Sequence, residues 1–294
     1  MKLIKNILIN IFFIFSSLLI ALIICESVLR IKHTLIPNYD IEMWKYAKNL
    51  KIKNTNPKIS HTHVKNKSVN LQNVDISINN LGQRDVKIDN IILKKYDRRF
   101  LILGSSIALG WGVSSEATFS NVLNKISQSN DKNWIFVNGG IGNYNTERYI
   151  NNYFSNWEKY HFTDIIVHFF VNDTEIINES NVNFFTKNTH IGVVVWKLIN
   201  SYKSSFKAEK LNNYYKEKYN DDYEGFIIAK NELKKLNKYC IDNNINCKIV
   251  LMPDIHQLNP YKLSFINQKI KKFSNDNKIS YLDLLKSFKK VDEV

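Results

Sequence analysis

The chain has 294 residues, 44% of them hydrophobic, which suits one large domain or a domain with appendages. The formal net charge is +14, but the lysines are scattered without a dense basic run, so we expect no nucleic-acid partner. The three cysteines form no C-x-x-C pair, which argues against zinc sites of that kind, and nothing else in the sequence predicts a metal site.

The first predicted element is an uncharged apolar stretch of 19 residues, 7–25. As a helix it would span about 28 Å, close to the hydrocarbon thickness of a bilayer. It exceeds the usual apolar part of a cleaved signal peptide, and no A-x-A-like cleavage site follows it. We therefore predict a single-pass anchor over residues 1–30, with the lipid bilayer as its partner. Lysines before the span favour a domain on the periplasmic or extracellular side.

Residues 31–96 are predicted to form a stalk and an accessory region. They contain an H-x-H pair, His61 and His63, for which we predict a solvated loop and not a metal site, because no acidic residue or further histidine lies close in the sequence. The segment "ISINNLGQRD" at 76–85 is predicted to be a short strand followed by a turn at 80–82.

Residues 97–294 alternate between strand and helix patterns. Continuous apolar runs are typical of parallel strands that are buried on both faces. The predicted strands are RFLILG (99–104), WIFVNGG (134–140), DIIVHFFVND (164–173), CKIVLMP (247–253) and ISYLDLL (279–285). This alternation predicts an α/β fold, a three-layer α/β/α doubly wound parallel sheet. A polar, aromatic insertion at about 174–225 is not assigned to any element.

The first three strands end in polar turns, GSS, NGGIGN and VND. Ligands of doubly wound sheets bind at the carboxyl ends of the strands, so these turns are expected to share one site. Ser106 would lie near the start of a helix, where free N–H groups favour negative charge. Asn143 and Asn172 can donate N–H bonds, and Gly142 allows close backbone approach. Acyl transfer needs such a serine with neutral donors, because charge develops on the carbonyl oxygen.

The segments "LILGSSIALGWGV", "VNGGIGNYNTERY" and "FVNDTE" resemble the first three motif blocks of the SGNH/GDSL hydrolases, whose fold is flavodoxin-like. "INNLGQRD" resembles a segment that precedes the domain in membrane-anchored bacterial members. The resemblance implies that Ser106 is the nucleophile, with its N–H in the oxyanion hole, and that Asn172 donates to the same oxygen. It also implies ester hydrolysis without a metal or organic cofactor, on acetyl groups of sugars or acyl chains of lipids.

Three departures from the family pattern matter. Ser105 stands at the aspartate position of the first block, and the second-block glycine aligns with Asn143, so either Gly142 or Asn143 is the second oxyanion donor. No histidine follows His256, although the family takes its base from beyond the last strand. Two explanations are open. The chain ends before that loop, or Asp254 and His256 of "PDIHQL" supply the base that a serine nucleophile needs.

Four other residues have simpler predicted roles. His168 is predicted to be a hydrogen-bonded core or edge histidine, and Asp173 a turn or capping residue. Cys240 and Cys247 are either a disulfide, which an oxidising compartment would favour, or two separate thiols.

The leading hypothesis is a membrane-anchored serine esterase or acyl hydrolase that acts on O-acyl groups of envelope glycans or lipids. An acyltransferase, in which a sugar hydroxyl replaces water, would use the same site. A non-catalytic member that binds glycan or a partner protein is the third alternative.

Overall fold

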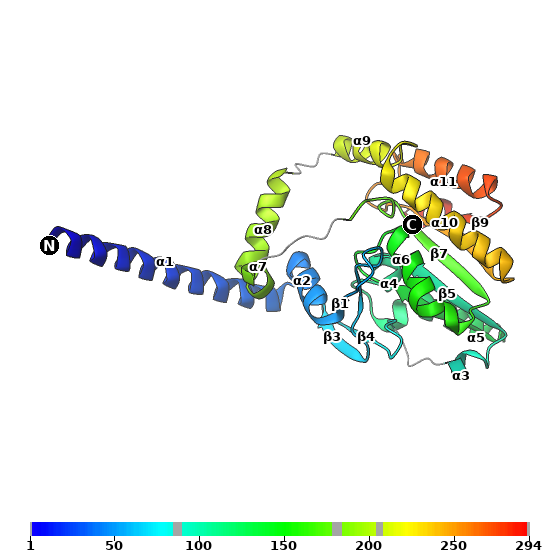
Figure 1. Ribbon diagram of the computed structural model, residues 1–294, viewed down its shortest axis with the longest axis horizontal. Helices are drawn as coiled ribbons and strands as arrows, with labels where there is room; N and C mark the ends of the chain where they lie inside the picture. Colours follow the sequence, from blue (N-terminus) through cyan, green and yellow to red (C-terminus); the bar gives the residue numbers. More distant parts are fainter. Residues whose placement is uncertain (1, 85–89, 178–183, 204–207, 293–294) are drawn as a thin grey trace. The chain divides into compact units, whose positions relative to one another are not determined.

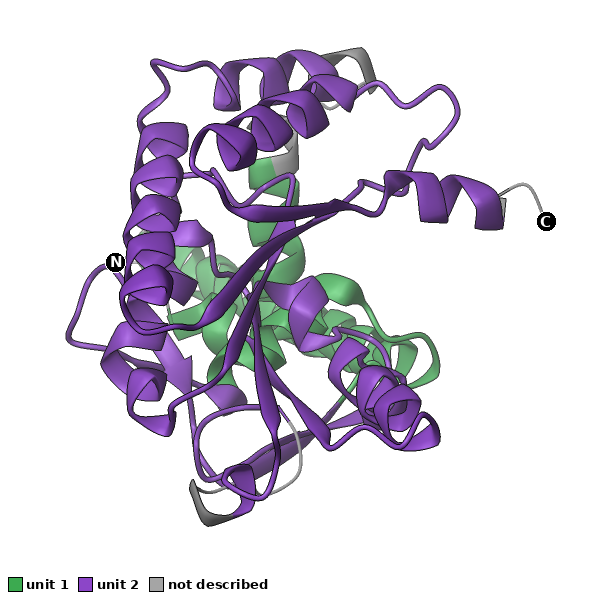
Figure 2. Ribbon diagram, turned by 90° about the vertical axis from the view of Figure 1, so that its right-hand side faces the viewer, with its two compact units in different colours: residues 1–48, 71–73, 180–205 green, residues 49–70, 74–179, 206–294 purple. Residues whose placement is uncertain are grey.

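The computed structural model describes residues 2–84, 90–177, 184–203 and 208–292 (Figure 1). The chain divides into two compact units, which Figure 2 shows in different colours. The first unit comprises residues 1–48, 71–73 and 180–205, and the second comprises residues 49–70, 74–179 and 206–294.

The first unit is helical. Its elements are α1 (Lys2–Leu35), most of α2 (Tyr39–Leu50), α7 (Phe184–Asn188) and α8 (His190–Lys203). Within the described residues, the segment Ile4–Leu35 of α1 is the one stretch long and apolar enough to cross a membrane, and none of its most apolar part is buried. This helix fits the single-pass anchor that the sequence predicts.

The second unit contains a five-stranded sheet. Its strands are β5 (Arg98–Gly104), β6 (Trp134–Gly140), β7 (Asp164–Phe170), β8 (Asn246–Met252) and β9 (Ser280–Asp283). All neighbouring pairs are parallel, in the order β6-β5-β7-β8-β9. From β5 the chain adds β6 on one side and then β7, β8 and β9 on the other, and this change of side makes the sheet doubly wound. The predicted α/β fold is therefore confirmed.

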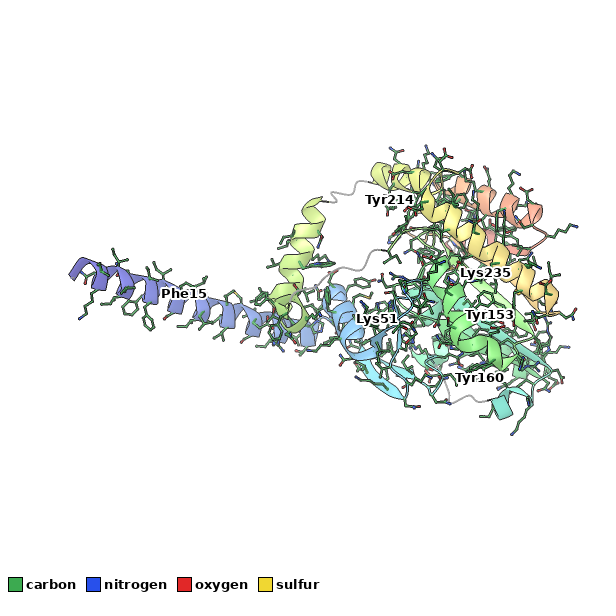
Figure 3. All side chains as sticks on the ribbon, in the orientation of Figure 1. Phe15, Lys51, Tyr153, Tyr160, Tyr214 and Lys235 are labelled. Atoms are coloured by element: carbon green, nitrogen blue, oxygen red, sulfur yellow. A yellow bond between two sulfur atoms is a disulfide. The ribbon has the colours of Figure 1, made fainter. Side chains whose placement is uncertain are left out.

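Helices flank this sheet. They are α3 (Asn90–Leu93), α4 (Ser106–Leu109), α5 (Phe119–Ser129), α6 (Thr146–Asn152), α9 (Ala208–Lys218), α10 (Glu224–Asp242), α11 (Ser264–Asp276) and α12 (Leu285–Asp292). A π-helical turn, Tyr153–Trp157, continues α6, and Tyr153 is fully buried (Figure 3). Short 3₁₀ turns occupy Ser115–Ala117 and Glu158–Tyr160.

Alternate residues of β5 face opposite sides of the sheet. Leu101 and Leu103 join the larger apolar cluster, to which α6, α10 and α11 contribute. Phe100 and Ile102 pack with Ala108 of α4 in a second, smaller cluster. The strand therefore has apolar side chains on both faces, which explains its uninterrupted apolar sequence.

The accessory segment of the second unit forms two small sheets. Strand β1 (Lys51–Lys53) pairs with β2 (His61–His63) in antiparallel fashion, and β3 (Lys67–Leu71) pairs with β4 (Val74–Ile78). The predicted strand and turn at 76–85 are confirmed by β4 and by the turn that follows it. The loop predicted for the H-x-H pair is wrong. Both histidines are buried. Residues two apart on a strand face the same side, so the two side chains share one face of β2.

Cys240 and Cys247 form a disulfide between the end of α10 and the start of β8. Their Cα atoms are 6.2 Å apart, within the usual range for a bridge, so this alternative is confirmed. Cys25 is a free, exposed thiol.

Removing the disulfide should destabilise the second unit. Because cross-linking restricts the unfolded chain, the Cys240→Ala/Cys247→Ala variant should lose about 2 kcal/mol of unfolding free energy, with a lower thermal midpoint. Cys25→Ser is the matched control and should leave both quantities unchanged. Equal stability of the double variant and the control in urea titrations would contradict the expectation.

Candidate active site

Four strands of the sheet end at a common edge. Gly104 of β5 is paired with Gly140 of β6 and His168 of β7, and His168 is paired with Val250 of β8. Every sequence-predicted site residue follows one of these four positions by two to six residues. The parallel register therefore brings the predicted residues to one edge, as ligand sites of this architecture require.

The turn after β5 distinguishes the two serines. Ser105 is the N-cap of α4, has an extended backbone and is 4% exposed. Ser106 is the first residue of α4 and is only partly buried. A Cβ atom at Gly104 would lie 2.7 Å from Cβ of Ala108 and 2.9 Å from the carbonyl oxygen of His168, so only glycine fits under this turn. Ser106 is thus the more accessible hydroxyl.

A buried arginine holds the other end of α4. The helix ends at Gly110, whose φ of +81° favours glycine. The guanidinium of Arg84, 1% exposed, donates to the carbonyl oxygens of Leu109 (3.0 Å), Gly110 and Val113 (2.6 Å). Carbonyl groups at the end of a helix lack intrahelical donors, and a cation there is favourable. Arg84 therefore fixes the segment that carries Ser106.

The turn after β6 contains Gly142 and Asn143. Asn143 is exposed and has a φ of +66°, a left-handed conformation that glycine and asparagine tolerate best. This explains how asparagine can stand where the resembled family has glycine. The carbonyl oxygen of Asn143 accepts a bond from Arg148 Nη1 at 2.9 Å, and that of Gly142 faces Nε2 of His61 at 3.0 Å.

His61 and His63 act as neutral donors to two turns. A carbonyl oxygen can only accept, so His61 donates from Nε2 to Gly142, and His63 donates from Nδ1 to the carbonyl oxygen of Gly82 at 2.9 Å. Burial lowers the pKa of His61 to about 2 and that of His63 to about 4. Tyr144 also donates its hydroxyl to the carbonyl oxygen of His61. The accessory hairpin is therefore tied to the turn after β6.

The turn after β7 places Asn172 and Asp173. The Asn172 side chain is half-buried, and its Oδ1 atom has no hydrogen-bond partner within the described residues. The nitrogen of this amide, Nδ2, is the atom that can donate to a ligand. Asp173 is 1% exposed and accepts the N–H of Phe170 at 3.0 Å, and burial raises its pKa well above the usual value. The turn role predicted for Asp173 is confirmed.

The turn after β8 carries an aspartate–histidine pair. Nδ1 of His256 lies 2.6 Å from Oδ1 of Asp254, and the same oxygen accepts the backbone N–H of His256 at 2.9 Å. The carboxylate is mostly buried, whereas the imidazole is 86% exposed. This arrangement fixes one ring nitrogen and leaves Nε2 as the accessible basic atom.

A cavity of about 140 Å³ lies beside this pair. Its lining residues are Leu211, Asn212, Asp254, His256, Gln257, Tyr261, Lys262 and Leu263. Oδ1 of Asn212 is buried and has no hydrogen-bond partner in the part of the chain that the structure describes. A small group with one apolar side and a hydroxyl or amide donor would complement this cavity.

The pair and the serine start from strands that are not adjacent. β7 lies between β5 and β8, so the two strands are about 10 Å apart at ~4.8 Å per strand. The structure records no hydrogen bond between Ser106 and His256 among the residues it describes. The turns place both residues at one edge without a hydrogen bond between them, and a general base must come within about 2.6–3.2 Å of the group whose proton it takes.

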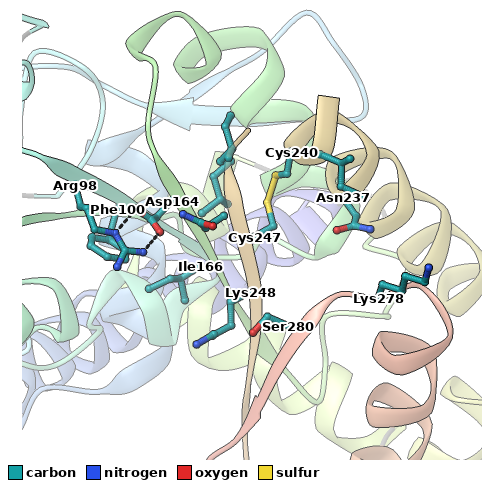
Figure 4. A pocket seen from close by; sticks show the side chains of 14 residues that line it. Arg98, Phe100, Asp164, Ile166, Asn237, Cys240, Cys247, Lys248, Lys278 and Ser280 are labelled. Carbon is teal, nitrogen blue, oxygen red and sulfur yellow. Dashed lines mark hydrogen bonds and ion pairs between the residues drawn. A yellow bond between two sulfur atoms is a disulfide. The ribbon is translucent and has the colours of Figure 1, made fainter. Parts of the chain in front are cut away.

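A larger cavity, of about 430 Å³, lies at the opposite edge of the sheet (Figure 4). Its walls include the ion pair between Arg98 and Asp164, at the starts of β5 and β7, and the Cys240–Cys247 disulfide. Its described lining includes Ser280 but no histidine, so it lacks a histidine–carboxylate pair that could activate a serine. Because sites of parallel α/β sheets occupy the carboxyl edge, this cavity does not belong to the candidate site.

His168 departs from its prediction in one respect. It is 4% exposed, which confirms a core position. Its ring lies against that of Phe119, with the two ring centroids 5.2 Å apart. The predicted hydrogen bonding is wrong, because neither ring nitrogen has a partner among the described residues. Burial lowers the pKa of His168 to about 4.

Within the described ranges, no group of three or more His, Cys, Asp or Glu side chains could hold a metal ion.

Two supporting residues, Arg84 and His61, were not assigned a role from the sequence. The i, i+2 spacing of the H-x-H pair indicates two side chains on one face of a strand, and this pattern could have identified His61 as a buried residue. Arg84 follows the turn of "INNLGQRD", but no local pattern relates it to carbonyl groups 25–29 residues later.

No protein-family model and no curated protein matches the chain. Solved structures that match include TesA, with 9% identity over 63% of this chain and 77% of that one and a TM-score of 0.40. The SGNH-hydrolase family esterase AlinE4 matches with 12% identity over 63% and 74% of the two chains (TM-score 0.38). The esterase EstA from Pseudoalteromonas sp. matches with 14% identity over 64% and 77% (TM-score 0.36).

AlinE4 is a member of the family that the three motif blocks resemble. At TM-scores of 0.40 or less, these likenesses support no conclusion about activity. The assignment of the α/β fold rests on the parallel sheet itself.

Acid should destabilise the hairpin of β1 and β2, which carries His61 and His63. The buried histidines bind protons only after unfolding, so their stabilising contribution is complete above pH ~6.5 and is lost as the pH falls toward their lowered pKa values. Each contributes at most about 1.4 kcal/mol per pH unit. Chemical denaturation gives the free energy of unfolding at pH 7 and at pH 5. The loss of this free energy between the two pH values should be smaller for His61→Gln, which can still donate to Gly142, than for the unchanged protein. An identical difference would contradict this account.

Replacing Arg84 should loosen the segment after Ser106. Lysine keeps the positive charge, but its single ammonium group cannot reach three carbonyl groups as the planar guanidinium does. Arg84→Lys should therefore lower the unfolding free energy by about 2–3 kcal/mol. Arg99→Lys is the control, because Arg99 also donates to backbone carbonyl groups but one of its two bonds is at the exposed surface. This variant should lower the unfolding free energy by less than about 1 kcal/mol. Similar losses in the two variants would argue against a special role for Arg84.

Proposed function

We propose that the protein is a membrane-anchored serine esterase or acyl hydrolase of SGNH type. The observation that carries this proposal is the position of Ser106, an accessible serine at the start of α4, on the edge that also presents the Asp254–His256 pair. Its substrates are O-acyl groups, acetyl groups in particular, on envelope glycans or lipids. The chemistry needs no metal or organic cofactor.

In this mechanism Oγ of Ser106 attacks the ester carbonyl carbon, and Nε2 of His256 takes the hydroxyl proton. The contact between Nδ1 and Asp254 orients the ring and stabilises the imidazolium that forms. The proton then passes to the departing alcohol, which leaves an acyl-serine. Water attacks the acyl group with the same base, which releases the acid and restores the serine.

The oxyanion donors of this mechanism come from three turns. The N–H of Ser106 belongs to the first turn of α4, where backbone donors have no intrahelical acceptor. The amide of Asn172 donates from the turn after β7. The turn after β6 contributes Gly142 or Asn143, and the left-handed backbone of Asn143 supports its inclusion, because it gives that turn the shape a glycine would give. Such donors act on charge that exists only in the transition state.

The location outside the cytoplasm is supported by two features. The helix α1 is long enough to cross a bilayer, and the Cys240–Cys247 disulfide is typical of proteins in oxidising compartments. An enzyme held at the membrane in that compartment meets acylated glycans and lipids of the envelope.

Four substitutions test the assignment with a p-nitrophenyl acetate-type substrate. Ser106→Ala should abolish turnover, whereas Ser105→Ala, the matched control, should retain much of it. Asn172→Ala should lower the rate by about 10²-fold with little change in KM, as expected of a donor used mainly in the transition state. His256→Gln should lower the rate by about 10²–10⁴-fold.

Labelling by a fluorophosphonate gives an independent measurement, and the label should attach to Ser106. If the full chain shows neither hydrolysis nor labelling that depends on Ser106, the protein is not an esterase, and the non-catalytic binding function takes its place. If Ser106 is labelled but His256→Gln is fully active, the serine assignment holds and the base assignment is wrong.

A further inference from the structure

Helix α8 is attached to the membrane-spanning helix α1 within the first unit. Oε1 and Oε2 of Glu26 accept the backbone N–H groups of His190 (3.0 Å) and Ile191 (2.9 Å). Glu26 is the first charged residue after the uncharged stretch 7–25. Because a carboxylate is costly inside hydrocarbon, Glu26 marks the level at which α1 leaves the apolar layer. Helix α8 therefore starts at that level.

Contacts with α2 fix the direction of α8. The indole rings of Trp44 and Trp196 meet edge to face with centroids 5.6 Å apart, and Lys197 forms an ion pair with Asp40. In Figure 1, α8 runs across the direction of α1. If α1 spans the bilayer, α8 lies along the bilayer surface.

The segment α7–α8 exposes large apolar side chains. The exposed fractions are 82% for Phe184, 45% for Val195, 61% for Leu198 and 54% for Ile199. Large apolar side chains gathered on a protein surface mark sites of contact with another protein or with a membrane. The apolar side chains of α1 are likewise uncovered, so both helices of the first unit expose apolar surface.

We propose that α7 and α8 form a second membrane contact, lying in the lipid–water interface with their exposed apolar side chains among the acyl chains. The occupant of this surface is the lipid bilayer, because α8 is bonded to α1 through Glu26 and begins where α1 leaves the apolar layer. Trp196 and Lys197 are residue types typical of this boundary. The inference rests on the anchoring part of the proposed function and is independent of the esterase chemistry.

The test uses the full chain in vesicles of phosphatidylcholine and phosphatidylglycerol. In a Cys25→Ser background, single cysteines at Leu198, Phe15 and Ile241 are labelled with an environment-sensitive fluorophore under non-reducing conditions. The three side chains have similar exposure, 61%, 71% and 65%, so they are matched (Phe15 is labelled in Figure 3). Phe15 reports on α1, and Ile241, on α10, reports on a water-facing surface.

We expect brominated lipids to quench the probes at Leu198 and Phe15 at least twofold and aqueous iodide to quench only the probe at Ile241. If the Phe15 probe is quenched by lipid while the Leu198 probe behaves like that at Ile241, the anchor stands and the second contact is refuted. A Leu198 probe protected from both quenchers would show a protein partner, such as a second copy, and would also refute it. Failure of the Phe15 probe would refute the anchor together with this inference.

Discussion

The close packing of Gly104 between α4 and β7 is the constraint on which the candidate site depends. No side chain fits at this position, so the chain turns directly from the strand into the helix. The turn leaves Ser105 buried and Ser106 accessible at the edge of the sheet. Two neighbouring serines thus have different environments for a steric reason, before any chemistry is considered.

The accessory segment then stabilises what the sheet edge positions. Arg84 holds the chain beyond α4, and His61 holds the turn after β6, both through backbone carbonyl groups. Bonds to carbonyl groups fix the shape of a turn without using the side chains at its tip. Consequently Ser106 and Asn143 remain available, while the segments that carry them are tied to the accessory segment.

Local patterns predicted the sheet well. The run from Arg99 to Gly104 is apolar on both faces because both faces are covered, and the observed strand β5 differs from the predicted one by a single residue, Arg98. The positions of Ser106 and Asn172 at strand ends followed from the same periodicity. These features depend on residues close together in the sequence, which is why sequence patterns can identify them.

The parts that were missed depend on distant pairs. His61 was assigned to a solvated loop because its neighbours are polar, yet it is buried by the turn around Gly142, 81 residues later. Among the described residues, His168 lacks the hydrogen bonds expected of a buried histidine, and its ring lies against that of Phe119. The role of Arg84 likewise requires knowing where the end of α4 lies. No local period encodes such pairings.

The left-handed backbone at Asn143 has a consequence for how this protein can change over evolutionary time. A β-branched or bulky residue there would strain the turn, so drift at this position is confined mainly to asparagine, aspartate and glycine. A single-nucleotide change converts an asparagine codon to an aspartate codon, whereas glycine takes two. Aspartate would put a negative charge where the proposed chemistry needs a neutral donor. Of the residue types that this backbone tolerates, the one reached by a single nucleotide change is therefore the one least compatible with an oxyanion.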